Sequence, residues 1–196
     1  YPKERLLNIL IDKNEDINIL KKKYDYIYSI KDIDGTILKL PRVIDKYKKT
    51  YNKEVLVGEI GYFNNHKSCI TDTSFNVVNS YTVAFLHSLG AERVTLSYEL
   101  TKKQIEILIK AYEERYKANP NLELVVEGYE EVMISKFSLN KYFNNDKIYL
   151  KDRFNNLYKI KERDNLMIIY NYKKRKDFDL SYYDIGVNSL RINKEE

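Results

Sequence analysis

The stretch RVTLSYELTKKQIEILIKAYEERYKANPNLELVVEG, residues 93–128, decides the fold class of this chain. It opens with the apolar run Arg93–Ser97 and closes with a second run, Leu122–Glu127, both typical of buried strands. Between the two runs, Thr101 and Gln104 have the spacing of a capping box at the start of a helix. The apolar residues that share one face of this helix are Ile105, Leu108, Ile109 and Tyr112. A strand, a helix and a strand in this order predict parallel strands joined by a right-handed crossover.

The same alternation continues on both sides of this stretch. The expected strands are Arg5–Ile11, Tyr24–Ile30, Thr36–Leu40, Val55–Tyr62, Ile70–Val78 and, near the end of the chain, Val187–Ile192. The expected helices follow Asn14 as an N-cap, span Arg42–Tyr51 after Pro41, and span Asn79–Gly90 with an apolar stripe of Val83, Phe85, Leu86 and Leu89. An open doubly wound sheet and a barrel both fit this order. About eight strands favour an α/β fold in the form of a compact or partial (β/α) TIM-like barrel.

The pattern of alternating strands and helices ends after Gly128. Short extended patterns occur at Ile148–Lys151, Leu157–Lys161 and Leu166–Tyr172, joined by Asn and Asp turns without a helix between them. They predict a small β-rich insertion over about residues 140–180, inside a single barrel domain that covers residues 1–196. The strand at Val187–Ile192 should pair in parallel within the sheet and not with the insertion, because its apolar positions suit burial on both faces.

Composition and charge exclude several classes of protein. The chain carries 34 Lys and Arg against 29 Asp and Glu, a net charge of +5, and its pI of about 8.9 permits an anionic partner such as RNA without requiring one. A mean hydropathy of −0.56, with no long uncharged apolar run, predicts a protein without a membrane span. With one cysteine, Cys69, the chain can form neither an internal disulfide nor a multi-cysteine metal site. We expect no metal or other cofactor and, since the start lacks a secretory signal, a cytoplasmic location.

Several segments together resemble one known family. Residues Phe75–Leu100, FNVVNSYTVAFLHSLGAERVTLSYEL, closely resemble the collagenase-like peptidase family, peptidase family U32. Later segments agree in order: Leu124–Ser135 (LVVEGYEEVMIS), Tyr149–Arg153 (YLKDR), Ile169–Asn171 (IYN) and Gly186–Ile192 (GVNSLRI). The resemblance implies the carboxyl-terminal barrel portion of a longer protein. A missing upstream domain or a partner chain would then complete any active site.

The resemblance carries two different expectations about chemistry. Members of the family are named as proteases, whereas several branches hydroxylate transfer or ribosomal RNA or ubiquinone precursors and carry an iron–sulfur cluster. The resemblance implies that the cysteines of this cluster fall near Ser138 and Asn165, but neither position is Cys. RNA modification is favoured over peptide hydrolysis as the ancestral chemistry, while the cluster itself is not expected here. The alternative is a non-catalytic binding or scaffold domain that has lost the iron–sulfur site.

Polar residues that follow predicted strands are the catalytic candidates. Asn79, Glu99 and Glu127 each come after a strand, and Tyr98 stands beside Glu99. Since the carboxyl ends of parallel strands share one edge of the sheet, these side chains could lie together at the carboxyl end of the predicted barrel. The alternative is structural, with Asn79 as a helix cap and Glu99 as a solvated loop carboxylate.

Basic residues in the insertion are the candidates for substrate binding. Arg153 lies in the YLKDR segment, where it could hold a phosphate or fix a turn with Asp152. The run Lys173, Lys174, Arg175 and Lys176 follows Tyr170 and Tyr172, so cations alternate with rings on which bases could stack, a pattern compatible with RNA. The other lysine clusters are typical of solvated faces: Lys21–Lys23, Lys46 with Lys48 and Lys49, and Lys102 with Lys103.

The sequence gives little support for a protease. His66 and Cys69 are three residues apart in a loop-like segment, but a surface His and a chance thiol explain them better than a catalytic pair. His87 adjoins Ser88 in a predicted helix, where neighbouring side chains point in different directions. No HExxH motif is present.

Overall fold

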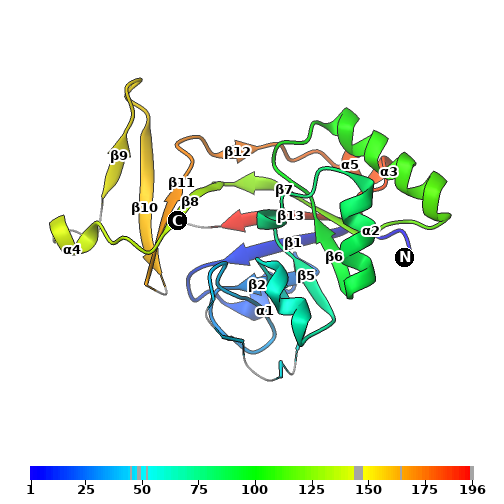
Figure 1. Cartoon of the computed structure of the whole chain (residues 1–196), viewed down its shortest axis with the longest axis horizontal. Coiled ribbons are helices and arrows are strands. Elements are labelled where there is room, and N and C mark those ends of the chain that lie inside the picture. Colours follow the sequence, from blue (N-terminus) through cyan, green and yellow to red (C-terminus); the bar gives the residue numbers. More distant parts are fainter. Residues whose placement is uncertain (45, 48–49, 52, 144–147, 164, 195–196) are drawn as a thin grey trace. The chain divides into compact units, whose positions relative to one another are not determined.

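The structure is a computed structural model (Figure 1). It describes all residues except 45, 48–49, 52, 144–147, 164 and 195–196. The chain forms two compact units. The first contains residues 1–126 and 178–196, and the second contains residues 127–177.

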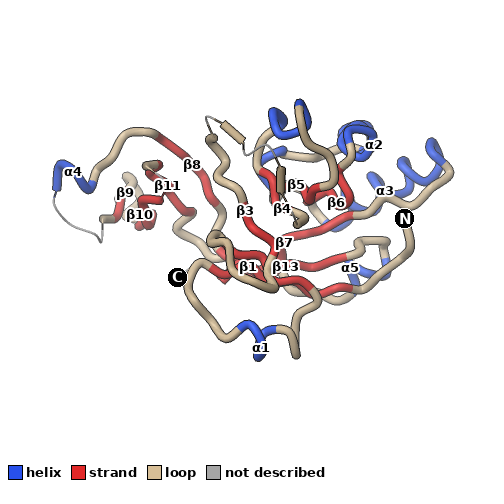
Figure 2. The backbone as a smooth tube through the Cα atoms, turned by 90° about the horizontal axis from the view of Figure 1, so that it is seen from below, coloured by secondary structure: helices blue, strands red, loops and turns tan. Residues whose placement is uncertain are grey.

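The first unit is built around a closed barrel of eight parallel strands. The strands are β1 (Leu6–Ile11), β2 (Tyr26–Ser29), β3 (Ile37–Lys39), β4 (Val55–Val57), β5 (Cys69–Thr71), β6 (Ala91–Thr95), β7 (Leu122–Gly128) and β13 (Ser189–Lys194). Figure 2 shows strand segments in red, with β1, β7 and β13 among those labelled. Neighbours follow the chain from β1 to β7, and β13 then lies between β7 and β1. The predicted TIM-like barrel is confirmed.

Strand β13 closes the ring. It pairs in parallel with β1, from Leu6 opposite Ser189 to Ile11 opposite Lys194, as the sequence predicts. The strand starts two residues later than expected, because the Val187 N–H still donates to the Tyr182 carbonyl of the preceding turn. Gly186, three residues before the strand, adopts a φ of +104°, in the left-handed region. A Cβ on Gly186 would lie 3.1 Å from a methyl group of Ile109, so a larger residue would strain both the backbone and this contact.

Two helices follow the predicted pattern closely. Helix α2 (Ser80–Leu89) is capped by Asn79 and ends at Gly90, and α3 (Lys102–Tyr116) carries the capping box of Thr101 and Gln104. The buried residues of α3 are the four predicted ones. Short helical segments complete the first unit: α1 (Ile17–Leu20), η1 (Ile60–Asn64), η2 (Thr73–Phe75) and α5 (Ser181–Asp184). None of the described helices has the length and apolar character that a membrane crossing requires.

Two helical predictions were wrong. The N-cap of α1 is Asp16 and not Asn14, because the Asp16 carboxylate accepts the backbone N–H groups of the next turn. The segment Arg42–Tyr51 forms no helix in its described residues, while residues 45, 48 and 49, including Lys48 and Lys49, lie outside the described part. Tyr47 and Tyr51 instead place their rings against Tyr62, a tertiary contact that outweighs the helix-forming tendency of the local sequence.

Two predicted strands end five or more residues before their expected bounds, and one predicted core residue is exposed. Strand β4 ends at Val57 because Glu59 caps the 3-10 helix η1, and β5 ends at Thr71 because Asp72 caps η2. Phe85 of α2 has half of its surface exposed, so it lies outside the buried stripe. Each strand ends where a carboxylate offers the backbone a different set of hydrogen bonds.

The second unit is a four-stranded antiparallel sheet in the order β8-β11-β10-β9. Its strands are β8 (Glu131–Ser135), β9 (Tyr149–Lys151), β10 (Leu157–Arg163) and β11 (Leu166–Tyr170). The short helix α4 (Asn140–Phe143) belongs to it, and β12 (Arg175–Lys176) pairs with the end of β7 at Gly128 and Glu127. Ile160, Met167 and Ile169 form its small apolar core.

Candidate functional site

The interior of the barrel has an apolar part and a polar part. Leu10, Tyr28, Leu56 and Ile70, from β1, β2, β4 and β5, form a fully buried cluster. The buried polar residues come mainly from β1, β6, β7 and β13: Asn8, Thr95, Glu123, Ser189, Arg191 and Asn193. Because side chains alternate between the two faces of a strand, every second residue of each strand faces this interior.

Glu123 is the centre of the polar part. Its side chain is completely buried, and its two oxygens accept five hydrogen bonds. The donors are Asn8 Nδ2 at 2.7 Å, Tyr28 Oη at 2.8 Å, Ser189 Oγ at 3.1 Å, Thr95 Oγ1 at 3.1 Å and Arg191 Nη1 at 2.9 Å. Burial, and then the neighbouring Glu123, raise the pKa of Tyr28 well above its usual value, so this phenol remains a hydrogen-bond donor.

Arg191 connects this centre to the carboxyl end of the barrel. Its Nη2 lies 2.5 Å from Oδ1 of Asp72, directly after β5, while Nη1 bonds Glu123. Lys39, the last residue of β3, lies 3.3 Å from the other oxygen of Asp72. Burial alone would raise the pKa of Asp72, but Lys39 and Arg191 outweigh burial and hold this pKa well below its usual range. The buried Arg191 and the nearly buried Lys39 thus offset the charges of the buried Glu123 and Asp72.

Five residues at this end form what we call the mouth cluster: Lys39, Asp72, Tyr98, Arg191 and Asn193. Asn193 Nδ2 donates to the Tyr98 hydroxyl at 3.3 Å, and burial is the main reason why the pKa of Tyr98 is raised. The Oδ1 atom of Asn193 is buried and accepts no hydrogen bond from the described residues. The carboxyl end is where barrels of this class bind ligands, so the mouth cluster is the best candidate site of the first unit.

The three predicted catalytic residues take separate positions. Asn79 caps α2, with its Oδ1 accepting the backbone N–H of Thr82 at 2.9 Å. Glu99 is exposed. Glu127, in the second unit, lies 2.6 Å from Lys174. No contact among the described residues joins the three, and a catalytic role for them stays a prediction.

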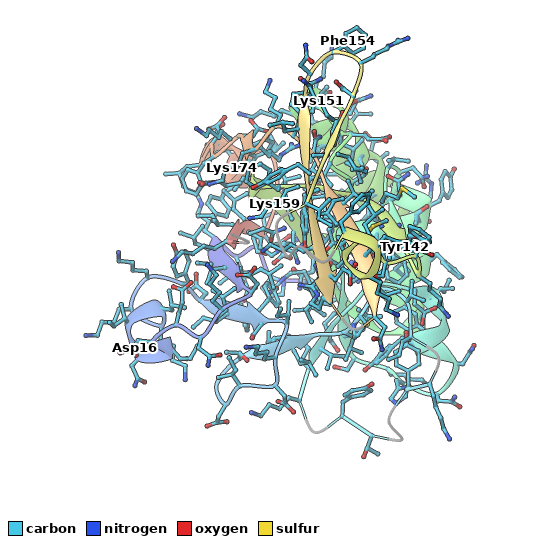
Figure 3. The ribbon with its side chains drawn as sticks, turned by 90° about the vertical axis from the view of Figure 1, so that its left-hand side faces the viewer. Asp16, Tyr142, Lys151, Phe154, Lys159 and Lys174 are labelled. Atoms are coloured by element: carbon cyan, nitrogen blue, oxygen red, sulfur yellow. The ribbon has the colours of Figure 1, made fainter. Side chains whose placement is uncertain are left out.

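Arg153 lies at the turn between β9 and β10, beside Phe154, which Figure 3 labels. Asp152 fixes this turn through the backbone N–H groups of Phe154 and Asn156, at 2.8 and 2.9 Å. Arg153 is exposed, with its guanidinium 4.7 Å from the centre of the Phe154 ring. The guanidinium is therefore not needed for the turn and remains accessible to an anion.

The basic run is partly neutralised within its own unit. Lys174 pairs with Glu127, and Arg175 pairs with Glu130 at 3.6 Å and Asp177 at 3.1 Å. Lys173 and Lys176 are exposed and form no ion pair within the described residues.

The two tyrosines beside the basic run differ in accessibility. Tyr172 has 47% of its surface exposed, but Tyr170 has only 2% exposed. The expectation that both rings offer stacking surfaces is wrong for Tyr170, because β11 is an inner strand whose residues are all buried.

No nucleophile stands beside a free base among the side chains considered from the sequence. His87 uses both ring nitrogens, Nδ1 at 2.7 Å from the Ala91 carbonyl and Nε2 accepting the Asn121 N–H at 3.3 Å. The Ser88 hydroxyl donates to the Phe85 carbonyl at 2.7 Å. Within the described residues, no group of three or more His, Cys, Asp or Glu side chains could hold a metal ion.

Cys69 should be inert in the folded protein. The thiol is buried, and burial raises its pKa to about 12, so almost no thiolate forms at neutral pH. We expect a thiol reagent such as Ellman's reagent to label the native chain at least a hundredfold more slowly than the chain in denaturant. Rapid native labelling, monitored by absorbance, would contradict this environment for Cys69.

Comparison with known families identifies the chain. The family model of peptidase family U32 matches residues 6–160. The chain belongs to peptidase family U32. The match covers the barrel from β1 to β7 and the second unit into β10. No curated protein and no solved structure gives a significant match.

The iron–sulfur cluster of the RNA-modifying U32 branches does not fit the residues present. Such a cluster is held by thiolates, usually four, and this chain has only the buried Cys69. At one position where the resemblance implies a cysteine, the Ser138 hydroxyl donates to Glu162 at 2.6 Å. At the other, Asn165 occupies a turn with a φ of +58°.

The mouth cluster was missed at the sequence level, apart from Tyr98. A signal was present, since Glu123 and Arg191 are charged residues inside otherwise apolar strand patterns, LELVVE and SLRI. Charged residues are almost never buried without a partner, so two such residues in buried strands predict an internal ion pair.

Proposed function

We propose that this U32 protein binds RNA through its second unit and serves as the RNA-recognition part of an RNA-modifying activity. Peptide hydrolysis is not favoured, because the side chains considered as nucleophiles are buried or already hydrogen-bonded. The chemical step would need groups from another segment or a partner chain, since this chain cannot supply four thiolates.

The distribution of charge is the observation that carries this proposal. Residues 127–177 contain 12 Lys and Arg against 8 Asp and Glu, a net charge of +4. The whole chain has a net charge of +5, so the remaining residues together contribute only +1. A concentration of positive charge on one small unit is typical of a surface that contacts phosphates.

Exposed aromatic rings accompany these cations. The most exposed rings of the second unit are Phe137, Tyr142, Phe143, Tyr149, Phe154 and Tyr172, each with 47–71% of its surface exposed. Exposed cations lie close to them in sequence at Lys136, Lys141, Lys151, Arg153, Lys173 and Lys176. Figure 3 labels Tyr142, Lys151 and Phe154 in this unit. Single-stranded RNA is commonly bound by such rings, on which bases stack, together with cations that contact the backbone.

Filter binding of transfer RNA tests the proposal. We expect measurable affinity of the parent chain at low salt, weakened by replacing both Lys173 and Lys176 with Ala. The logarithmic salt dependence should flatten by about 0.7 for each phosphate that the variant no longer neutralises. Phe154→Ala should cost a further 1–3 kcal/mol, roughly, if a base stacks on this ring.

The matched control replaces Lys22 and Lys23, two exposed lysines of the first unit, with Ala. It removes the same charge and should leave the affinity nearly unchanged. Equal weakening in both double variants would show that only net charge matters. No affinity of the parent chain at low salt would favour the second candidate function, a non-catalytic scaffold, which the missing thiolates support.

A further inference from the structure

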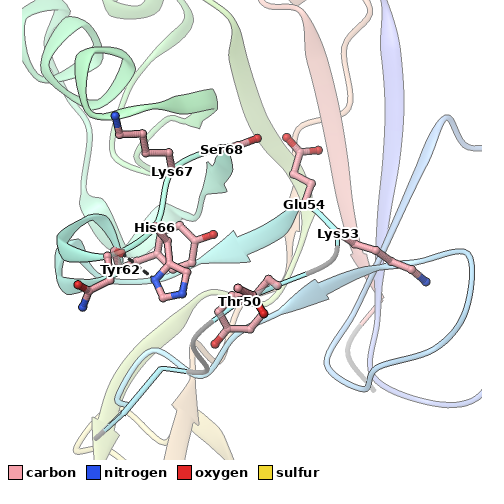
Figure 4. Close-up of a pocket in the computed structure, with 9 residues that line it drawn as sticks. Thr50, Lys53, Glu54, Tyr62, His66, Lys67 and Ser68 are labelled. Carbon is pink, nitrogen blue, oxygen red and sulfur yellow. Dashed lines mark hydrogen bonds between the residues drawn. The ribbon is translucent and has the colours of Figure 1, made fainter.

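A cavity of about 440 Å³ lies at the amino end of the barrel, away from the mouth cluster (Figure 4). Glu54 and Ser68, directly before β4 and β5, lie on its wall, and Tyr51, Tyr62 and His66 supply aromatic rings. We call it the amino-end cavity. RNA binding by the second unit does not use any of these residues.

The rings of the amino-end cavity are held in contact with one another. Tyr62 stacks on His66 at 4.8 Å between ring centres, and Tyr51 lies 5.3 Å from His66 and 6.1 Å from Tyr62. Tyr62 is anchored in the core, with 2% of its surface exposed. The negatively polarised faces of such rings attract organic cations.

Two polar groups of the cavity have no partner within the described part of the chain. The Glu54 carboxylate is half-buried and makes no hydrogen bond or ion pair there, and the Tyr62 hydroxyl makes no hydrogen bond. A half-buried carboxylate without a partner is costly, so an arriving cation would gain an interaction that the empty cavity lacks.

The surrounding charges are of both signs and leave the Glu54 carboxylate without a paired cation among the described residues. Arg93 attracts Glu54 from a distance, whereas Glu92 and Glu123 add negative potential at the same carboxylate. Lys53 and Lys67 also line the cavity, but Figure 4 shows both amino groups pointing away from Glu54. Lys53 is neutralised by Asp34 at 2.9 Å.

We propose that the amino-end cavity binds a guanidinium group, which pairs with the Glu54 carboxylate and lies against the half-buried Tyr51 and His66 rings. A guanidinium is planar and weakly hydrated, so it can stack on a ring while its edge donates two hydrogen bonds to a carboxylate. The Tyr62 and Ser68 hydroxyls are within the same cavity and can accept its remaining N–H groups. The group could belong to a free small molecule or to an arginine of another chain.

Calorimetric titration with N-acetyl-arginine amide tests this inference. We expect one site per chain, at least tenfold weaker binding of the uncharged isostere N-acetyl-citrulline amide, and weaker binding of N-acetyl-lysine amide. Glu54→Gln should weaken the arginine compound at least tenfold, and Tyr62→Phe, which removes only the hydroxyl, about threefold. Agmatine, titrated in parallel, distinguishes a free small molecule from a chain residue by which compound binds more tightly.

The control variant Glu114→Gln removes an exposed carboxylate of α3 and should bind like the parent. Equal affinity of the parent for the arginine and citrulline compounds would overturn the proposal. So would unchanged affinity of a folded Glu54→Gln variant. The comparison of ligands uses the parent chain alone, so it stands even if a variant fails to fold.

Discussion

Replacing Arg191 with Met should destabilise the barrel by about 3–5 kcal/mol. Arg191 is completely buried and is the cation shared by Glu123 and Asp72, at 2.9 and 2.5 Å. Its removal leaves Glu123 with only the more distant Arg93 among the described cations, and Asp72 with Lys39, while both carboxylates stay buried. Breaking a buried ion pair costs this much because the remaining charge stays desolvated.

Urea denaturation followed by circular dichroism measures this destabilisation. The control Lys194→Met removes an exposed cation from the same strand, paired with Glu15 at 2.8 Å, and should change stability little. Adding Glu123→Gln to Arg191→Met should restore part of the stability, because a neutral amide replaces the carboxylate that has lost its ion-pair partner. A decrease below about 1 kcal/mol for Arg191→Met would show that the buried charges are better solvated than the contacts indicate.

Asp72 should make the stability of the barrel depend on pH in the acid range. Its pKa is held below the ordinary value of about 3.9, so the unfolded chain binds the proton more readily than the folded chain. The stabilisation is therefore complete above about pH 5 and is lost progressively as the pH falls through 4 and below. Asp72→Asn should lower stability at pH 7 by about 2–4 kcal/mol and flatten this acid dependence.

Urea midpoints measured from pH 3 to pH 7 for the parent and for Asp72→Asn decide this point. Asp34→Asn is the matched control, because Asp34 also pairs with a lysine but is fully exposed. It should leave the stability at pH 7 nearly unchanged, since water screens such a pair. Parallel pH profiles for the parent and Asp72→Asn would mean that other carboxylates govern acid unfolding.

The sequence by itself determined the order of most elements and the class of the fold. The capping box of Thr101 and Gln104, the glycine after α2 and the buried face of α3 depend on residues only a few positions apart. Hydrogen bonds and side-chain periodicity over such short distances are fixed by local geometry. Strand β13 was also recognised, because an apolar run after repeated strand and helix units has few other places in a parallel sheet.

Only the tertiary structure decided which residues form the mouth cluster and which cations of the basic run are accessible. Arg191 meets Asp72 and Glu123 across 119 and 68 residues of sequence, and closure of the barrel brings them together. Likewise, Lys174 pairs with Glu127, which lies 47 residues earlier in the chain. Lys174 therefore differs from Lys173 and Lys176, which form no ion pair within the described residues. The sequence shows which residues are charged, but the energy of a charge depends on the distance and burial of its partners. Both quantities are set by the folding of segments far apart in the chain.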